Sequence, residues 1–492
     1  MLRSRIVVGV VMYVCLELSE AAFTEPIIRG PYLQSVSESS IYVVWRTKGP
    51  IDAVVRYGPK MRRPKFESTE ENVTLRVSAD VQGVEAETLH AETAGDREKR
   101  ESRQRDDPTG DSDIYQYEVH LTGLEANTVY FYGVYDGTTE LAGRDSVHRF
   151  KTSPAIGTAA PLRIWVVGDS GTGGGAQRKV YAAMKEFVDS TKRDLDMFIH
   201  VGDMAYSDGA NYEFQRGFFD AYEETLKQIV VWPSMGNHEG HTSRGLTGKG
   251  PYYDAYVVPT RGESGGVASG TEAYYSFDVG QAHFICLDSH DLDRKSTGPM
   301  AQWLREDLNQ TTGEWLIAFW HHPPYTKGSH DSDLEGQLIE MRSEIMPILE
   351  AGGVDLVMTG HSHIYERSML MDGAYSTPTV AAGVILDDGD GNPDGDGAYR
   401  KSAGLNPHEG TIQIVAGHGG AGVSRRGTMP VMREIFVENG SVVLDLDGDT
   451  LTGTMINRDR VIRDVFALVK SGKVEVNRIE NPWQHEPLQV DR

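Results

Sequence analysis

Seven side chains that can bind metal ions stand where short apolar runs of the sequence stop. They are Asp169, Asp203, Tyr206, Asn237, His321, His361 and His363. Each run is typical of a buried strand. Carboxylate, phenol, amide and imidazole groups in this number exceed what one ion needs, so the set indicates two ions that share a bridging carboxylate.

A pair of metal ions is suited to the hydrolysis of phosphate esters. Two cations lower the pKa of a bound water, so that a hydroxide forms near neutral pH and attacks phosphorus in line. His238 directly follows Asn237 and could donate a proton to the leaving oxygen or to the phosphate. We expect Glu239 to orient His238 and not to touch the substrate.

The elements that must position these residues follow an α/β pattern. Strand-like runs at 162–167, 195–201 and 229–232 alternate with helix-like segments at 173–190 and 214–227. This rhythm predicts parallel strands with crossover helices. Ligands of such sheets bind beyond the carboxyl ends of the strands, so we expect one shared rim. Further segments predict a helix at 334–351 and strands at 315–320, 354–359, 412–416, 442–446 and 465–469.

Residues 24–153 have an all-β pattern instead. Runs that alternate in polarity and are rich in β-branched and aromatic residues are separated by Gly and Pro. The segment 123–132 is similar to the tyrosine-corner strand of fibronectin type III sandwiches, with Trp45 as the core tryptophan. Within this domain, the polar stretch of about 92–113 predicts a flexible insertion.

Five motifs occur in the order found in purple acid phosphatases, which belong to the calcineurin-like metallophosphoesterases. They are Gly168-Asp169-Ser170-Gly171, Gly202-Asp203-Met204-Ala205-Tyr206, Gly236-Asn237-His238-Glu239, His321-His322-Pro323-Pro324-Tyr325 and Gly360-His361-Ser362-His363. Gly30-Pro31-Tyr32-Leu33-Gln34 also resembles the start of the family's N-terminal domain. The resemblance implies a fibronectin type III-like sandwich, then an α/β metallophosphoesterase sandwich of two sheets flanked by helices at 161–470, and a tail at 471–492.

The resemblance also implies a role for each ligand. Asp169, Tyr206 and His363 would hold Fe³⁺, whereas Asn237, His321 and His361 would hold Zn²⁺, Fe²⁺ or Mn²⁺, with Asp203 bridging the two ions. His322 directly follows His321 and is the alternative ligand there. The superfamily usually has a histidine where this chain has Gly171, and Tyr206 would supply the missing donor. His238 and, with a poorer local match, His330 would contact the phosphate.

The resulting functional prediction is a phosphomonoesterase that uses a metal-bound hydroxide. A phosphodiesterase with the same metals is a close alternative. An adhesion or binding protein with a degenerate enzyme domain is a third interpretation, which the intact ligand set disfavours. The net charge of −24 disfavours nucleic acid as a partner, whereas a small phosphorylated substrate fits the site. The oligomeric state is open.

The N-terminus predicts export. Arg3 and Arg5 precede an apolar run at 6–16, and Ser19 and Ala21 fit a cleavage site, so 1–22 is expected to be a signal peptide of a secreted or extracytoplasmic protein without a membrane partner after cleavage. A non-cleaved anchor is the alternative. The sequence Asn-x-Ser/Thr occurs at Asn72, Asn309 and Asn439, which are possible glycosylation acceptors.

The segment Asp388–Asp396 spaces oxygen ligands at alternate positions, as calcium-binding loops do. It lacks the glutamate that completes an EF-hand. A Ca²⁺ site and a solvated acidic loop are therefore both open interpretations of this segment.

Overall fold

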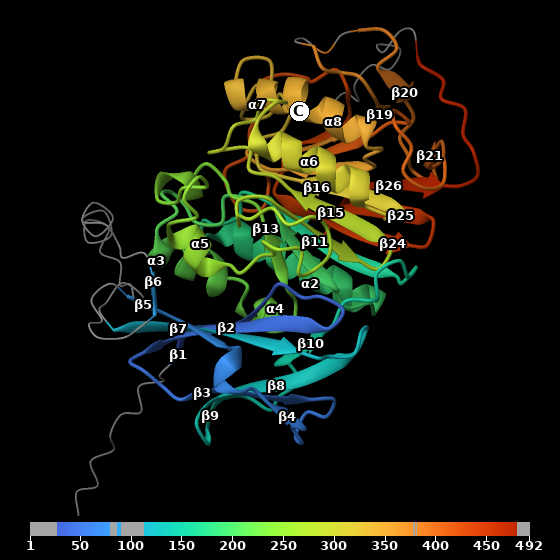
Figure 1. Cartoon of the computed structure of the whole chain (residues 1–492). Helices are drawn as coiled ribbons and strands as arrows, with labels where there is room; N and C mark the ends of the chain where they lie inside the picture. The colour runs from blue at the N-terminus through green and yellow to red at the C-terminus, as the bar shows by residue number, and fades with distance from the viewer. Residues whose placement is uncertain (1–26, 79–85, 90–112, 377–378, 380, 480–492) are drawn as a thin grey trace, which may run out of the picture.

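The computed structural model describes residues 27–78, 86–89, 113–376, 379 and 381–479. Within these residues, an all-β N-terminal part packs beneath a larger α/β part (Figure 1). The predicted fold class, a β-sandwich followed by a two-sheet α/β fold, is confirmed.

The N-terminal part is a sandwich of two sheets. Its elements are β1 (Ile27–Gln34), β2 (Ser40–Lys48), β3 (Ala53–Gly58), β4 (Phe66–Glu67), η1 (Glu70–Asn72), β5 (Val73–Ser78), β6 (Glu87–Leu89), β7 (Ile114–Thr122), β8 (Val129–Asp136), β9 (Thr139–Gly143) and β10 (Arg149–Lys151). One sheet has the order β1-β2-β7-β5-β6, and the other has the order β10-β8-β3-β4 with β9 beside β8.

Two aromatic residues of this sandwich have the predicted environments. Trp45 is fully buried and stacks on Tyr117, with ring centroids 5.4 Å apart. The backbone N–H of Glu125 donates to the hydroxyl of Tyr130 over 3.0 Å, which is the hydrogen bond of a tyrosine corner. The corner ties the chain before β8 to β8 itself.

The α/β part is built on two seven-stranded sheets. The first contains β11 (Leu162–Val167), β12 (Met197–His200), β13 (Val231–Pro233), β21 (Tyr399–Lys401), β24 (Gly440–Asp447), β25 (Thr450–Asn457) and β26 (Ile462–Lys470). The second contains β14 (Tyr275–Val279), β15 (Ala282–Cys286), β16 (Trp315–Phe319), β17 (Leu356–Thr359), β18 (Tyr365–Ser368), β22 (Ile412–Ala416) and β23 (Met432–Phe436). A small ribbon pairs β19 (Leu370–Met371) with β20 (Ile385–Asp387).

The parallel core of each sheet matches the predicted rhythm. The first sheet runs β13-β12-β11-β24-β25-β26-β21, with β11, β12 and β13 parallel. The second runs β14-β15-β16-β17-β22-β18-β23, with β15, β16, β17 and β22 parallel. The strands predicted near the C-terminus are divided between the sheets, since β22 joins the second and β24 pairs antiparallel with β11 in the first. This division depends on long-range pairing, which local sequence does not encode.

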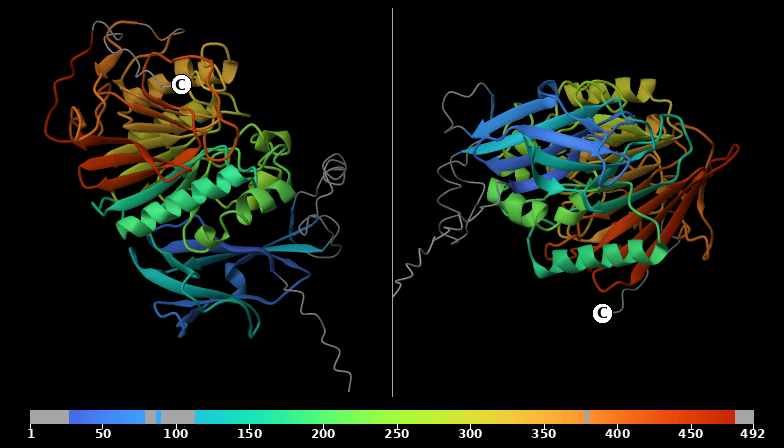
Figure 2. Two further views of the ribbon diagram at one scale, coloured as in Figure 1. Left: turned by 180° about the vertical axis from the view of Figure 1, so that it is seen from behind. Right: turned by 90° about the horizontal axis from the view of Figure 1, so that it is seen from below.

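Helices cover the outer faces of the two sheets. Helix α2 (Gly175–Thr191) lies across the first sheet and α6 (Pro299–Gln310) covers the second (Figures 1 and 2). The short helices between β12 and β14 are α3 (Asn211–Phe214), η2 (Gln215–Phe219), α4 (Glu223–Leu226), η3 (Glu239–His241) and α5 (Pro251–Ala255). The predicted helix at 214–227 is thus divided into α3, η2 and α4.

The predicted helix at 334–351 begins later and changes geometry. It consists of α7 (Gly336–Glu340), a π-helical turn η4 (Met341–Ile345) and α8 (Met346–Ala351). Pro347 lies in the first turn of α8 and has no N–H to donate to the preceding turn. The wider turn directly before Pro347 accommodates this missing bond.

Buried arginines join the sandwich to the α/β part. The guanidinium of Arg29 donates to Gln215 over 2.7 Å, and that of Arg46 donates to the side-chain oxygen of Asn211 over 2.7 Å. The hydroxyl of Tyr32 donates to the carbonyl of Ala255 over 2.9 Å. Asn211 starts α3, so the sandwich holds the segment that follows Tyr206.

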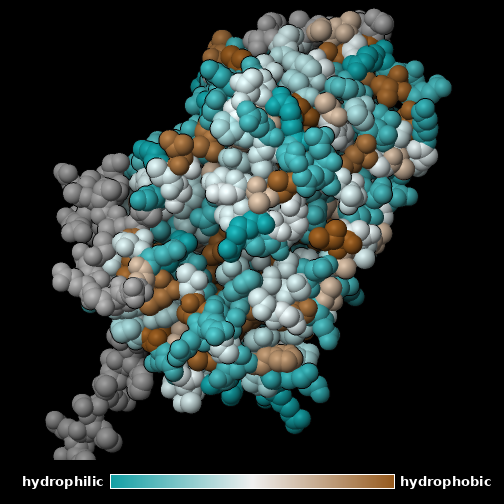
Figure 3. Space-filling model, viewed as in Figure 1, coloured by the Kyte–Doolittle hydropathy of each residue, from teal (hydrophilic) through white to brown (hydrophobic). Residues whose placement is uncertain are grey.

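Three predictions fall wholly or partly outside the described residues. These are the signal peptide at 1–22, most of the insertion at 92–113 and the last part of the tail, 480–492. Among the described residues, no helix is long and apolar enough to cross a membrane. On the face seen in Figure 3, hydrophobic residues form small groups among polar ones.

Asn439 does not have the environment of a glycosylation acceptor. Its side chain is 4% exposed, and its amide donates to the carbonyls of His418 and Ala421 over 3.1 and 2.8 Å. A glycan on this nitrogen would replace both bonds, so the acceptor predicted there is incompatible with the fold. Asn309 is exposed and Asn72 is half-buried, and both remain predictions.

A buried histidine of β15 should make stability depend on pH. His283 lies 2.7 Å from Asp278 and 2.8 Å from Asp307; burial opposes its protonation, but the two carboxylates raise the pKa of His283 to about 9. Because folding raises the pKa of His283, its protonation stabilises the fold fully at pH values below the ordinary pKa of histidine. This stabilisation is lost as the pH rises through about 9. His283→Gln should therefore lower the free energy of unfolding by on the order of 3 kcal/mol at pH 6, and by less at pH 9.5. Urea unfolding at both pH values measures this, and an equal loss at both would contradict it.

Candidate metal centre

All seven predicted ligands lie at the carboxyl ends of parallel strands. In the first sheet, Asp169 follows β11, Asp203 and Tyr206 follow β12, and Asn237 follows β13. His321 follows β16, and His361 and His363 follow β17, in the second sheet. The two sheets therefore present their donors to each other at one rim.

Three of these residues adopt a left-handed backbone conformation. The φ angles are 54° at Asp169, 59° at Asp203 and 64° at His361. Positive φ is uncommon for residues with a Cβ and is found at functional sites that the surrounding fold stabilises. The tight turns let each side chain point back toward the strand ends.

One group of donors gathers around the hydroxyl of Tyr206. This oxygen lies 3.2 Å from Asp169 Oδ1, 3.0 Å from Asp203 Oδ2 and 3.3 Å from His363 Nε2. His363 Nε2 is itself 3.3 Å from Asp169 Oδ1. These four side chains offer one nitrogen and several oxygens around one point.

A second group gathers around the side-chain oxygen of Asn237. His361 Nδ1 lies 2.8 Å from this oxygen, and His321 Nε2 lies 3.0 Å from it. His321 Nε2 is also 3.4 Å from Asp203 Oδ1, so the two oxygens of Asp203 face different groups. His322 instead lies 2.9 Å from the hydroxyl of Ser289.

The electrostatics of both groups fit bound cations. Asp169 and Asp203 are 0% and 1% exposed, and in the described part of the chain the basic groups within 4 Å of them are histidines. Although burial opposes ionisation, the imidazole of His321 lowers the pKa of Asp203. Burial and the two carboxylates raise the pKa of Tyr206, so its phenolate form requires a nearby cation. Buried anions of this kind are stable when they coordinate metals.

His238 lies next to Tyr206 and Asp203, and the orientation of its ring is fixed by a hydrogen bond. Its Nδ1 is 2.6 Å from the carbonyl of Ser207, and its ring centroid is 4.4 Å from that of Tyr206. Its Nε2 is 3.8 Å from Asp203 Oδ2, so this nitrogen faces the donors. The carbonyl that orients the ring is part of the backbone and leaves no signal in the sequence.

Glu239 orients the loop of Asp203 and not His238, contrary to expectation. Its two oxygens accept the backbone N–H groups of Asp203, Met204, Ala205 and Gly236 at 2.8 to 3.0 Å. Burial and the charge of Asp203 raise the pKa of Glu239 to about 7. Glu239 therefore clamps two strand-end loops, which were not recognised as its partners because backbone donors are not visible in sequence.

Glu239→Gln should loosen the metal centre without removing a ligand. One amide oxygen replaces two carboxylate oxygens, and the new NH₂ group faces N–H donors. We expect metal affinity to fall by roughly 10- to 100-fold, as for other groups that orient ligands. Competition with a chelator measures the change, and Glu223→Gln, at an exposed position of α4, is the control. Unchanged affinity would mean that the loops hold without Glu239.

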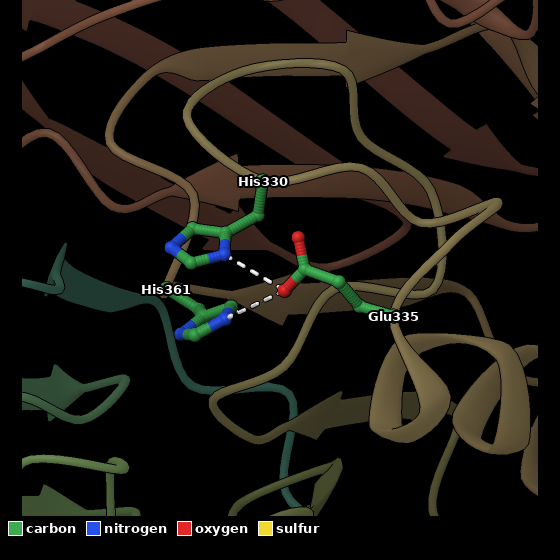
Figure 4. A group of neighbouring side chains, drawn as sticks. All are labelled: His330, Glu335 and His361. Carbon is green, nitrogen blue, oxygen red and sulfur yellow. Dashed lines mark hydrogen bonds and ion pairs between the residues drawn. The ribbon is translucent and has the colours of Figure 1, made fainter.

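His330 reaches the same rim from a loop of the second sheet (Figure 4). Its ring centroid lies 3.8 Å from that of His361, and its Nδ1 is 2.8 Å from Glu335 Oε2. The same oxygen is 3.7 Å from His361 Nε2. Glu335 thus links a proposed substrate residue to a proposed ligand. It lies five residues after His330 and was not expected to take part, because no motif includes it.

Comparisons with known families match both parts of the chain. A model described as the purple acid phosphatase N-terminal domain matches residues 29–152, and a calcineurin-like phosphoesterase model matches residues 162–365. The two models occur in this order and cover the sandwich and the strand ends that carry the donors. The chain belongs to the purple acid phosphatase family.

Individual relatives agree with this family. Purple acid phosphatase 18 of Arabidopsis thaliana is 30% identical over 303 residues, which are 58% of this chain and 62% of that protein. Purple acid phosphatase 23 of the same plant is 30% identical over 280 residues, 51% of this chain and 57% of that protein. The match thus spans less than two-thirds of these relatives.

Solved structures support the fold. A purple acid phosphatase from yellow lupin seeds superposes with a TM-score of 0.68 at 19% identity, covering 90% of this chain and 74% of that one. PhoD superposes with a TM-score of 0.54 at 13% identity, over 90% of this chain and 94% of that one. At these identities the likeness concerns architecture.

The structure explains the glycine that replaces the usual superfamily histidine. A Cβ built on Gly171 would lie 1.9 Å from the carbonyl oxygen of Met204. The carbonyl of Gly171 also accepts the backbone N–H of Tyr206 over 3.1 Å. The loop that carries Tyr206 therefore packs on position 171 and leaves no space for a side chain there.

The acidic loop Asp388–Asp396 is organised by its own backbone. Asp390 Oδ1 accepts the N–H of Asn392 over 2.7 Å, and Asp396 accepts the N–H of Asp390 over 2.9 Å. Its residues belong to none of the three groups of His, Cys, Asp and Glu side chains that converge within the described residues. The Ca²⁺ site stays a prediction.

Proposed function

We propose that this protein hydrolyses phosphomonoesters at a dinuclear centre of one ferric and one divalent ion. The observation that carries this proposal is the position of Asp203, whose two oxygens face the Tyr206 group and the Asn237 group. A carboxylate between two sets of donors is what a bridged pair of ions requires.

The two donor sets differ in chemistry. Asp169, Tyr206 and His363 would hold Fe³⁺, because carboxylate and phenolate oxygens are hard anionic donors. Asn237, His321 and His361 would hold Zn²⁺, Fe²⁺ or Mn²⁺, because amide and imidazole donors suit divalent ions. When bound, the ions would activate a water molecule and neutralise charge on the phosphoryl oxygens.

The chain's own residues would bind and protonate the substrate. The Ser207 carbonyl fixes Nδ1 of His238, so Nε2 can donate to a phosphoryl oxygen or to the leaving oxygen. His330, whose Nδ1 is bound to Glu335, can present its Nε2 from the other side of the rim. Two imidazole nitrogens that can donate to one phosphate group favour a small phosphorylated substrate.

A phosphodiesterase with the same centre is the second candidate. A panel of monoesters and diesters, measured across pH beside metal analysis, distinguishes the two activities. We also propose that the protein acts after export, on the basis of residues 1–22, and that nucleic acid is not its substrate, since the net charge is −24.

Tyr206→Phe tests the ferric site, because it keeps the ring and removes the donor oxygen. A ferric phenolate absorbs visible light by charge transfer, so the native protein should be coloured and the variant should lose the band and hold iron less tightly. Asp169, Asp203 and His363 remain, so some hydrolysis should persist. The measurement is a visible spectrum with iron quantified in the same sample.

Tyr222→Phe is the matched control, because it removes a buried hydroxyl outside the donor groups. It should keep the visible band. A native protein with stoichiometric ferric iron and no band that depends on Tyr206 would refute the assignment of the tyrosine as a ligand.

A further inference from the structure

A second cluster of residues that can bind metal ions lies apart from the donors of the candidate metal centre. It consists of Glu350, near the end of α8, Asp372, just after β19, and His408, shortly before β22. Glu350 and His408 precede the amino ends of β17 and β22, whereas the proposed catalytic ligands follow the carboxyl ends. The cluster therefore lies at the amino-terminal ends of these strands, opposite the rim that carries the proposed catalytic ligands.

The three side chains converge closely. One oxygen of each carboxylate and one ring nitrogen of His408 all lie within 4.8 Å of one another. His408 Nδ1 is 3.0 Å from Asp372 Oδ1, and the backbone N–H of His408 donates to the carbonyl of Glu350 over 3.0 Å. His408 has a φ of 60°, so a strained backbone holds it in place.

Glu350 supplies an independent observation. Its side chain is 1% exposed, and Oε2 accepts the N–H of Gly373 and the hydroxyl of Tyr375. Oε1 is buried, and among the described residues no N–H group donates to it, although buried carboxylate oxygens nearly always accept a hydrogen bond. This oxygen belongs to the residue that converges on Asp372 and His408.

The buried charges of the cluster are only partly balanced. Asp372 is 2% exposed and pairs through Oδ2 with the guanidinium of Arg478, which leaves Oδ1 toward His408. Glu350 has no such arginine among its hydrogen-bond and ion-pair partners in the described part of the chain. Burial and the charge of Asp372 raise the pKa of Glu350 to about 8, as expected for a carboxylate that lacks a counter-ion.

We propose that Glu350, Asp372 and His408 bind one divalent transition-metal ion, with zinc as the best match. Carboxylate oxygens and imidazole nitrogens are both ligands of Zn²⁺, and three protein ligands leave a fourth position for water. Ligand atoms around one tetrahedral ion lie about 3 to 3.5 Å apart, close to the observed 3.0 Å between His408 and Asp372.

The role of this ion is structural. It joins the end of α8, the segment after β19 and the loop before β22, of which the last two are otherwise paired by a single antiparallel bridge between Met371 and Thr411. Arg478 adds the C-terminal segment, because it also donates to the carbonyls of Asp372 and Gly383. Binding displaces any proton held between the two carboxylates, so metal and proton compete for one position.

The test measures zinc in full-length protein whose proposed catalytic centre has been disabled. Asp203→Ala protein is equilibrated with zinc and desalted, and its metal content is measured by mass spectrometry. We expect about one zinc per chain to remain, and His408→Ala or Glu350→Gln in the same background to remove it. His120→Gln, at a half-buried histidine of the sandwich, is the matched control and should leave the count unchanged.

Thermal unfolding provides the second readout. Added zinc should raise Tm by several degrees in the Asp203→Ala protein and not in its His408→Ala derivative. In the wild-type background, His408→Ala should lose one metal per chain with hydrolysis changed less than twofold. Failure of the proposed catalytic function would leave this His408-dependent zinc intact, so the two proposals are tested separately.

Two outcomes would overturn the proposal. One is a zinc content and Tm shift that do not depend on His408. The other is Glu350→Gln protein that retains both, because glutamine mimics a protonated carboxyl and the pair would then share a proton in place of a metal. His408 is about half exposed, so its alanine variant should fold even if a Glu350 variant does not.

Discussion

Asp203→Ala should abolish hydrolysis, lowering kcat/KM by about four orders of magnitude or more. Asp203 lies between the two donor groups, 3.0 Å from the hydroxyl of Tyr206 and 3.4 Å from His321. Without the bridge, each ion loses a charged ligand, and the purified variant should contain less than one metal in the catalytic centre. Metal analysis and a phosphomonoester assay on the same sample measure both effects.

The exposed residue Asp447 on β24 offers a matched control, and Asp447→Ala should keep metal and activity. Asp203→Asn separates the effect of charge from that of shape. Asparagine removes the negative charge but keeps one side-chain oxygen, which can still accept the backbone N–H of His238, as Oδ1 of Asp203 does over 3.1 Å. An Asp203→Ala protein with both catalytic metals and near-normal turnover would show that this carboxylate does not bridge.

His238→Ala should lower turnover by roughly 10²- to 10⁴-fold and leave the metal content unchanged. The ring faces the donors through Nε2, whereas the neighbouring Asn237 supplies the oxygen next to His321 and His361. Loss of a proton donor affects the chemical step, so the decrease should be largest for substrates with poor leaving groups. Turnover on a series of phenyl phosphates measures this dependence.

His241 is the matched control for this variant. It is about half exposed, and its ring centroid is 5.6 Å from that of His238. His241→Ala should change turnover by less than threefold, because this ring lies outside the two donor groups. Wild-type turnover of His238→Ala on several monoesters would exclude His238 from the reaction.

The elements of the fold were largely predictable because their signals are local. Apolar runs gave β11, β12, β16 and β17 nearly at their true bounds, since burial on both faces of a parallel strand requires such runs. The division of 334–351 at Pro347 was missed, although proline is a local signal. The assignment of β22 and β24 to different sheets was not predictable, because it depends on pairing with β17 and β11, far away in sequence.

The sequence by itself determined which residue types stand at the strand ends, and hence the chemistry that the rim offers. The sequence itself shows glycines beside polar residues after most of the apolar runs. Parallel pairing of the strands then brings their carboxyl ends, and these polar residues, together. The order of Asp169, Asp203, Asn237 and the later histidines along the chain was therefore enough to predict a metal centre before any contact between them was known.

Only the tertiary structure decided which atoms meet. Glu239 clamps backbone N–H groups, and the Ser207 carbonyl orients His238. Glu350 meets Asp372 and His408, which lie 22 and 58 residues further along the chain. These contacts join loops whose paths depend on the packing of whole sheets, and half of the partners are backbone atoms, which every residue carries. Sequence specifies side chains, whereas the meeting of a side chain with a distant backbone requires the folded chain.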